Sequence, residues 1–90
     1  MTQESEELEI AEYETGFAAN RSLLISNGGN ISGSSILDVK VSTIGGRPER
    51  KSVSVGDSIL YDAGEQGRFE IRLLAVTSNT GKFLISRVQK

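Results

Sequence analysis

Hydrophobic and polar residues alternate most regularly in residues 68–76. Phe69, Ile71, Leu73 and Ala75 are apolar, and charged residues separate the first three of them. Successive side chains of a strand point to opposite faces. This period of two therefore predicts a strand that turns one face towards the core.

A second strand is predicted at residues 82–88, after a short connection at residues 78–81. The connection is rich in turn-forming residues, and we expect Gly81 to adopt the positive φ that such a turn requires. Two apolar strands joined in this way predict an antiparallel hairpin.

Three upstream segments also have strand-like patterns: residues 21–26, 36–44 and 53–62. Turns that contain glycine are expected at residues 45–46, 56–57 and 64–67. Within the 36–44 segment, Leu37, Val39 and Val41 share one face, which could pack against the apolar face of residues 68–76 from a second sheet.

The N-terminal stretch is acidic and harder to interpret. Its composition predicts that residues 1–6 form a disordered tail, which leaves residues 7–90 as a single β-domain. Residues 7–14 alternate like a strand but also suit a helix, and we favour the strand because the remainder of the chain is β. Phe17 is expected to anchor this segment to the core.

The spacing of strands and turns predicts an all-β fold of six to seven short strands. The expected architecture is a small antiparallel β-sandwich of immunoglobulin-domain size, and the alternative is a small SH3-like or OB-like barrel. Two loops are expected between the strands, a glycine-rich loop at residues 26–35 and a charged loop at residues 45–51.

The composition argues against catalysis. The chain has no histidine and no cysteine, so a single copy cannot form a Ser–His or Cys–His pair or a histidine metal site. We therefore expect no enzymatic activity, no cofactor and no metal. Without cysteine, a signal-peptide pattern or a long apolar run, the expected location is the cytoplasm.

Charge is distributed unevenly along the chain. Residues 1–14 hold half of the acidic residues and no basic one. The candidate binding residues are basic residues of the remaining chain: Arg47, Arg50, Lys51, Arg68 and Arg72. If one face of the domain gathered them, that face could bind an anion.

The leading hypothesis is a non-enzymatic binding module that associates with another protein or with itself, as an inhibitor, adaptor or assembly subunit. Its contacts would come from the 26–35 and 45–51 loops, or from an unpaired edge strand at residues 21–26 or 82–88. The alternative is a binder of anions, nucleotides or nucleic acid, in which the acidic N-terminal tail shields a basic face.

Overall fold

The computed structural model describes residues 5–19, 21–31 and 35–88. These ranges contain eight strands: β1 (Ser5–Ile10), β2 (Thr15–Ala18), β3 (Leu23–Asn30), β4 (Leu37–Thr43), β5 (Glu49–Val53), β6 (Ser58–Asp62), β7 (Arg68–Thr77) and β8 (Thr80–Val88). A short 3-10 helix, η1 (Gly64–Gln66), lies between β6 and β7. In the described ranges, no helix has the length and apolar character needed to cross a bilayer.

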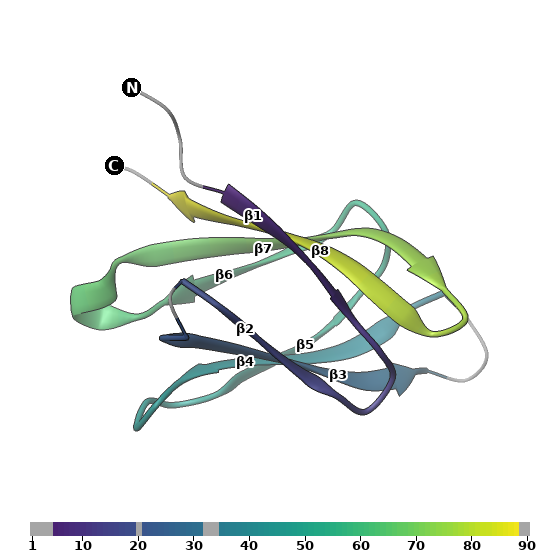
Figure 1. The fold of residues 1–90 in the computed structure, drawn as a ribbon, viewed down its shortest axis with the longest axis horizontal. Coiled ribbons are helices and arrows are strands. Elements are labelled where there is room, and N and C mark those ends of the chain that lie inside the picture. Colours follow the sequence, from purple (N-terminus) through teal and green to yellow (C-terminus); the bar gives the residue numbers. More distant parts are fainter. Residues whose placement is uncertain (1–4, 20, 32–34, 89–90) are drawn as a thin grey trace.

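The strands form two antiparallel sheets that lie face to face (Figure 1). Sheet A has the order β1-β8-β7-β6, and sheet B has the order β2-β3-β4-β5. Consecutive strands are therefore neighbours within one sheet, or they are edge strands of different sheets between which the chain crosses. This arrangement confirms the predicted all-β sandwich. The strand β2 was not predicted, and most of β5 was assigned to a loop because its residues are charged.

The two predicted inner faces are confirmed. Their residues are all at most 3% exposed: Leu37, Val39 and Val41 on β4, and Phe69, Ile71 and Leu73 on β7. Side chains from both sheets meet in one apolar core. Burial of such side chains contributes about 1.5–3 kcal/mol each, which makes this core the main source of stability.

One residue of the predicted inner face of β7 points outwards. The register of β7 against β8 shifts between Leu73 and Ala75, so Leu74 forms a bulge. A bulge adds one residue to one strand and reverses the side to which the following residues point. Ala75 is consequently exposed, and Val76 packs against the core instead.

The N-terminal strand begins earlier than expected. Ser5 and Glu6 belong to β1, so the predicted tail of residues 1–6 is wrong for these two positions, and its first four residues lie outside the described ranges. Ser5 and Glu6 are strand residues because they pair with Ser86 and Ile85 of β8, in a register that also turns Leu8 and Ile10 towards the core. The preferred strand is confirmed as far as Ile10, and a turn follows it.

Phe17 does not anchor the N-terminal segment to the core. Its side chain is 50% exposed, whereas the neighbouring Ala18 is 1% exposed. The alternation of β2 turns Ala18 inwards and Phe17 outwards, because only one of two adjacent strand residues can face the core.

The β7–β8 turn also differs from its prediction. Ser78 and Asn79 have the positive φ angles, and Gly81 is a buried residue of β8. A Cβ atom on Gly81 would lie 2.7 Å from Cε2 of Phe83 and 2.9 Å from Cδ1 of Leu37. Gly81 is thus required by close packing in the core and not by the turn.

Tyr61 on β6 links the two sheets at one edge of the sandwich. Its hydroxyl donates a hydrogen bond to the Arg47 carbonyl at 2.7 Å and accepts one from the Thr43 amide at 3.2 Å. The ring is 4% exposed. The hydroxyl therefore supplies partners for two backbone groups of the β4–β5 connection.

Replacing Tyr61 with phenylalanine should lower the free energy of unfolding by about 1–3 kcal/mol, because the two backbone groups lose their partner in a partly buried place. Urea unfolding monitored by circular dichroism measures this change. Tyr13→Phe is the matched control, because the Tyr13 side chain is 77% exposed. Equal stability of the two variants would contradict the assigned role of the Tyr61 hydroxyl.

Candidate functional site

The structure does not bring the five predicted binding residues together. Arg47 lies in the β4–β5 connection, and Arg50 and Lys51 lie on β5 of sheet B. Arg68 and Arg72 lie on β7 of sheet A. All five are exposed, but they are distributed over both layers of the sandwich.

Three of these five residues have partners within the protein. Arg50 binds Asp38, Arg72 donates to Glu70 at 2.9 Å, and Lys51 donates to the Ser58 carbonyl at 3.0 Å. The hydrogen bond from Arg72 lowers the pKa of Glu70, against an opposing effect of burial. The charges of Arg50 and Arg72 are therefore neutralised by neighbouring carboxylates, whereas Lys51 keeps its charge.

The acidic N-terminal residues also have partners in the sandwich. The Glu6 carboxylate accepts a hydrogen bond from the Ala19 amide at 3.0 Å, and Glu7 lies 3.5 Å from the Lys82 ammonium. Both glutamates belong to β1, which pairs with β8. Their carboxylates are therefore held at sheet A and beside the β2–β3 turn.

The predicted edge strands are interior strands. Residues 21–26 overlap β3, which lies between β2 and β4, and residues 82–88 lie in β8, between β1 and β7. The edges are formed by β1, β2, β5 and β6. Glu6 and Lys51 lie on edge strands and reach across to the other sheet, and charged side chains in such places oppose pairing with a foreign strand.

The predicted loops are shorter than expected. β3 continues to Asn30 and includes the Gly28–Gly29 pair, so residues 26–30 are strand, whereas residues 32–34 lie outside the described ranges. β5 begins at Glu49, so residues 49–51 are also strand. β4 pairs with Asn27 and Asn30 on either side of the two glycines, so β3 continues through a bulge despite the low strand propensity of glycine.

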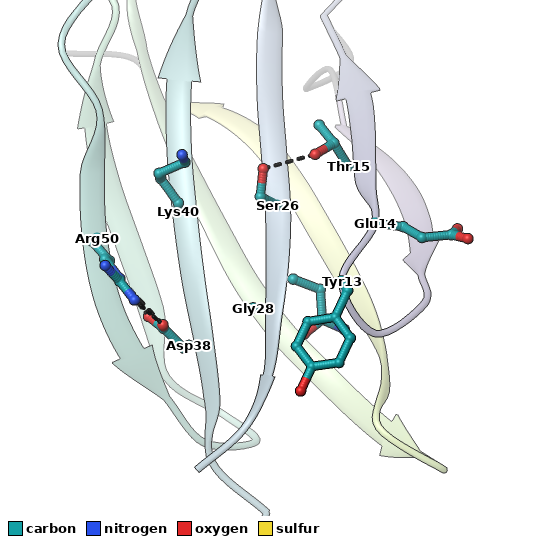
Figure 2. Close-up of a pocket in the computed structure, with 9 residues that line it drawn as sticks. Tyr13, Glu14, Thr15, Ser26, Gly28, Asp38, Lys40 and Arg50 are labelled. Carbon is teal, nitrogen blue, oxygen red and sulfur yellow. Dashed lines mark hydrogen bonds and ion pairs between the residues drawn. The ribbon is translucent and has the colours of Figure 1, made fainter.

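A hollow with a volume of about 310 Å³ lies on the outer face of sheet B (Figure 2). It extends across the sheet from β2 to β5. Its lining consists mainly of polar residues: Tyr13, Glu14, Thr15, Ser26, Asn27, Gly28, Asp38, Lys40 and Arg50. Of the predicted binding residues, only Arg50 contributes to it.

Thr15, Ser26, Lys40 and Arg50 form a row across this hollow, because each is paired with the next in the strand register. The hydroxyls of Thr15 and Ser26 are 2.9 Å apart and hydrogen-bonded. Lys40 follows on β4 and Arg50 on β5. The row therefore presents hydroxyl groups at one end and cationic groups at the other.

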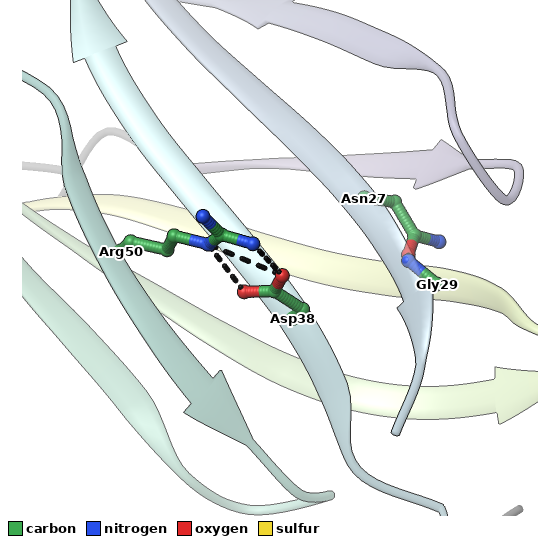
Figure 3. A network of polar contacts seen from close by, with 4 residues as sticks. All are labelled: Asn27, Gly29, Asp38 and Arg50. Carbon is green, nitrogen blue, oxygen red and sulfur yellow. Dashed lines mark hydrogen bonds and ion pairs between the residues drawn. The ribbon is translucent and has the colours of Figure 1, made fainter. Parts of the chain in front are cut away.

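Arg50 and Asp38 form a fork-like ion pair at the β5 side of the hollow (Figure 3). Nε of Arg50 donates to both carboxylate oxygens at 3.0 and 3.2 Å, and Nη2 donates to Oδ2 at 2.6 Å. These bonds lower the pKa of Asp38 below its ordinary value of 3.8, against an opposing effect of burial. Asp38 therefore stays ionised over the whole neutral range.

The contribution of this ion pair should depend on pH. Because the pKa of Asp38 is lowered in the folded state, the stabilisation is fully present above 3.8 and is lost as the pH falls through the lower folded value. The stability difference between the wild type and Asp38→Asn should thus shrink on acidification below 3.8, as measured by urea unfolding at several pH values. Glu65→Gln, at an exposed position of η1, is the control. If the stability difference between the wild type and D38N does not depend on pH, the lowered pKa of Asp38 does not contribute to stability as assigned.

Tyr13 stands at the opposite side of the hollow. It lies in the turn after β1, where the Glu14 amide donates to the Ala11 carbonyl and the Tyr13 amide donates to the Asn27 carbonyl at 2.7 Å. Its φ of 66° is left-handed, and its side chain is 77% exposed. The ring lies beside Gly29, where an added Cβ atom would come within 3.0 Å of it.

Sequence reasoning did not identify Tyr13, Asp38 or Lys40 as site residues. The outward direction of Asp38 and Lys40 followed from the alternation of residues 36–44, but their neighbours across the sheet did not. No pattern in the sequence predicts that Tyr13 is exposed in a turn with a left-handed backbone. In the described residues, no group of three or more acidic side chains is placed to hold a metal ion.

The fold and the hollow define the class of the protein as a small all-β sandwich with a polar surface site on one sheet. No family model, curated protein or solved structure matches the chain.

Proposed function

We propose that this protein is a non-enzymatic binding module that associates with another protein through the outer face of sheet B. The observation that carries the proposal is the combination of strain and exposure at Tyr13. A left-handed backbone at such a residue costs of order 1–2 kcal/mol. The exposed ring recovers little of this by burial, and strain of this kind is concentrated at binding sites.

Other residues of the same face support a protein partner. Phe17 is 50% exposed and points to the same side of β2 as Thr15. Tyrosine, phenylalanine and arginine are enriched in protein interfaces, and Arg50 lies at the far end of the row. Regular strands hold Phe17 and Arg50, which limits the conformational entropy that binding would remove.

The test is a selection from a displayed library of random twelve-residue peptides. The wild type should enrich a set of related peptides, and Tyr13→Gly should weaken their binding by about 30-fold, as expected for loss of an interface hot spot. Glycine adopts a left-handed backbone without strain, so the same variant should be as stable as the wild type or more stable. Titration calorimetry and thermal unfolding measure the two effects.

Leu60→Ala is the matched control. Leu60 is also an exposed apolar residue, at 59%, but it lies on β6 of sheet A. Its replacement should leave peptide affinity unchanged. The proposal is contradicted if no peptide is enriched, or if the enriched peptides bind Tyr13→Gly as tightly as the wild type.

A further inference from the structure

The outer face of sheet B has an excess positive charge at its centre. Lys40 is exposed and lies between Ser26 and Arg50 in the strand register. Asp38 is already bound by two nitrogen atoms of Arg50, so this ion pair adds no net charge. Among the described residues, none forms an ion pair or hydrogen bond with the Lys40 ammonium group.

The second carboxylate of the lining does not compensate for Lys40. Glu14 lies next to Tyr13 at the β2 side, and Figure 2 shows its carboxylate pointing away from the centre of the hollow. The groups nearest to Lys40 in its row are the Ser26 hydroxyl and the Arg50 guanidinium. The centre of the face is therefore complementary to a single negative group of a ligand.

The dimensions of the face favour an extended segment over a small anion. Neighbouring strands are about 4.8 Å apart, so β2 and β5 are separated by about 14 Å. An extended peptide advances about 3.3 Å per residue and would cover this width with four to five residues. A small anion could occupy the position next to Lys40 but would leave the Tyr13 side of the hollow empty.

We infer that the occupant of this face is an extended segment of a partner protein that carries an acidic side chain for Lys40 and an apolar side chain for Tyr13. This inference rests on the proposed function and specifies the partner. Tyr13 precedes β2, and Lys40 lies two strands away, a distance of about 10–12 Å. Successive side chains of an extended segment point to opposite faces, so the acidic and apolar side chains should lie four positions apart, which spans about 13 Å.

The experiment uses the full chain and the peptides enriched by the wild type. These peptides should carry aspartate or glutamate four positions from an aromatic or large aliphatic residue. Lys40→Glu should weaken their binding about tenfold or more, because attraction is replaced by repulsion, and Lys40→Arg should retain most of it. The affinity of the wild type should also fall as the salt concentration rises from about 50 to 500 mM.

A double-mutant cycle separates direct pairing from a general charge effect. Changing the acidic residue of the peptide to its amide should weaken binding to the wild type, but should have little effect on binding to the Lys40→Glu variant. Arg68→Glu makes the same change of charge on sheet A and should leave affinity nearly unchanged. An equal loss with Arg68→Glu would overturn the inference.

Two further results would also overturn it. If the enriched peptides depend on Tyr13 but lack an acidic residue, or bind Lys40→Glu as tightly as the wild type, the acidic partner is wrong while the protein-binding proposal stands. If light scattering shows that the wild type is a dimer and that Lys40→Glu is a monomer without any peptide, the occupant is a second copy of this chain.

Discussion

Replacing Asn27 with aspartate should lower the free energy of unfolding by about 3–5 kcal/mol. Asn27 is the buried polar side chain among the described residues, at 1% exposure, and its Nδ2 donates to the carbonyls of Ile10 and Asn79 at 2.9 Å each. Aspartate has the same shape but cannot donate when ionised. Two carbonyls would lose their partner and face a buried negative charge, and each such loss costs about 1–3 kcal/mol.

The effect should be large because Asn27 joins separate parts of the sandwich. Its Oδ1 also accepts a hydrogen bond from the Gly29 amide at 2.9 Å (Figure 3). One side chain thus binds the end of β1, the β7–β8 turn and the irregular part of β3. A small domain has only about 5–15 kcal/mol of net stability, so the loss would be a large fraction of it.

Urea unfolding at neutral pH tests this prediction. Asn30→Asp is the matched control, because Asn30 is half-buried on the same strand, and its side chain makes no hydrogen bond to the described residues. It should change stability by less than about 1 kcal/mol. If both variants lose the same stability, the change of charge and not the bonding of Asn27 is the cause.

Replacing Phe83 with alanine should lower the free energy of unfolding by about 3–5 kcal/mol, the usual cost of a cavity left by a buried aromatic ring. Phe83 is 1% exposed and lies on β8, paired with Leu8 on one side and Leu73 on the other. The packing around Gly81 places the ring close to Leu37 of sheet B, so the cavity would open between the sheets.

Leu84→Ala provides the control for this core prediction. Leu84 is the next residue of β8 and is only half-buried, because it points to the outer face of sheet A. Its loss should cost markedly less than the loss of Phe83. A larger loss at Leu84, measured by the same urea unfolding, would contradict the assigned orientation of β8.

The predictable parts of the fold are those in which local pattern and tertiary environment agree. Residues 36–44 and 68–74 alternate, and the structure buries their apolar faces. The turn at residues 64–67 also lies where its glycines predicted it, with positive φ at Gly64 and Gly67. In these segments the period of the side chains and the conformational freedom of glycine determine the structure without help from distant residues.

The errors occur where contacts distant in sequence override local signals. Gly28 and Gly29 suggest a loop, but β4 pairs with β3 around them. The bulge at Leu74 reverses the orientation of Ala75, and the sequence does not mark it. Phe17 is exposed although it is aromatic, because Ala18 occupies the inward position of β2.

The candidate site could be predicted only in part. Alternation indicated that Asp38 and Lys40 point outwards, and Arg50 was recognised as basic. Their common position depends on strand register, which pairs β3, β4 and β5 and aligns residues up to 35 positions apart in the sequence, from Thr15 to Arg50. The exposure of Tyr13 depends on a backbone conformation that no residue type encodes.

The sequence by itself determined an all-β domain, two inner faces and a set of turns, because these follow from side-chain periodicity and from the backbone properties of single residues. Only the tertiary structure decided which strands form the edges, which charges are neutralised and which residues place an exposed aromatic ring and the Lys40 ammonium group on the same face of sheet B. These features depend on the pairing of distant strands, which is selected by the packing of the whole core.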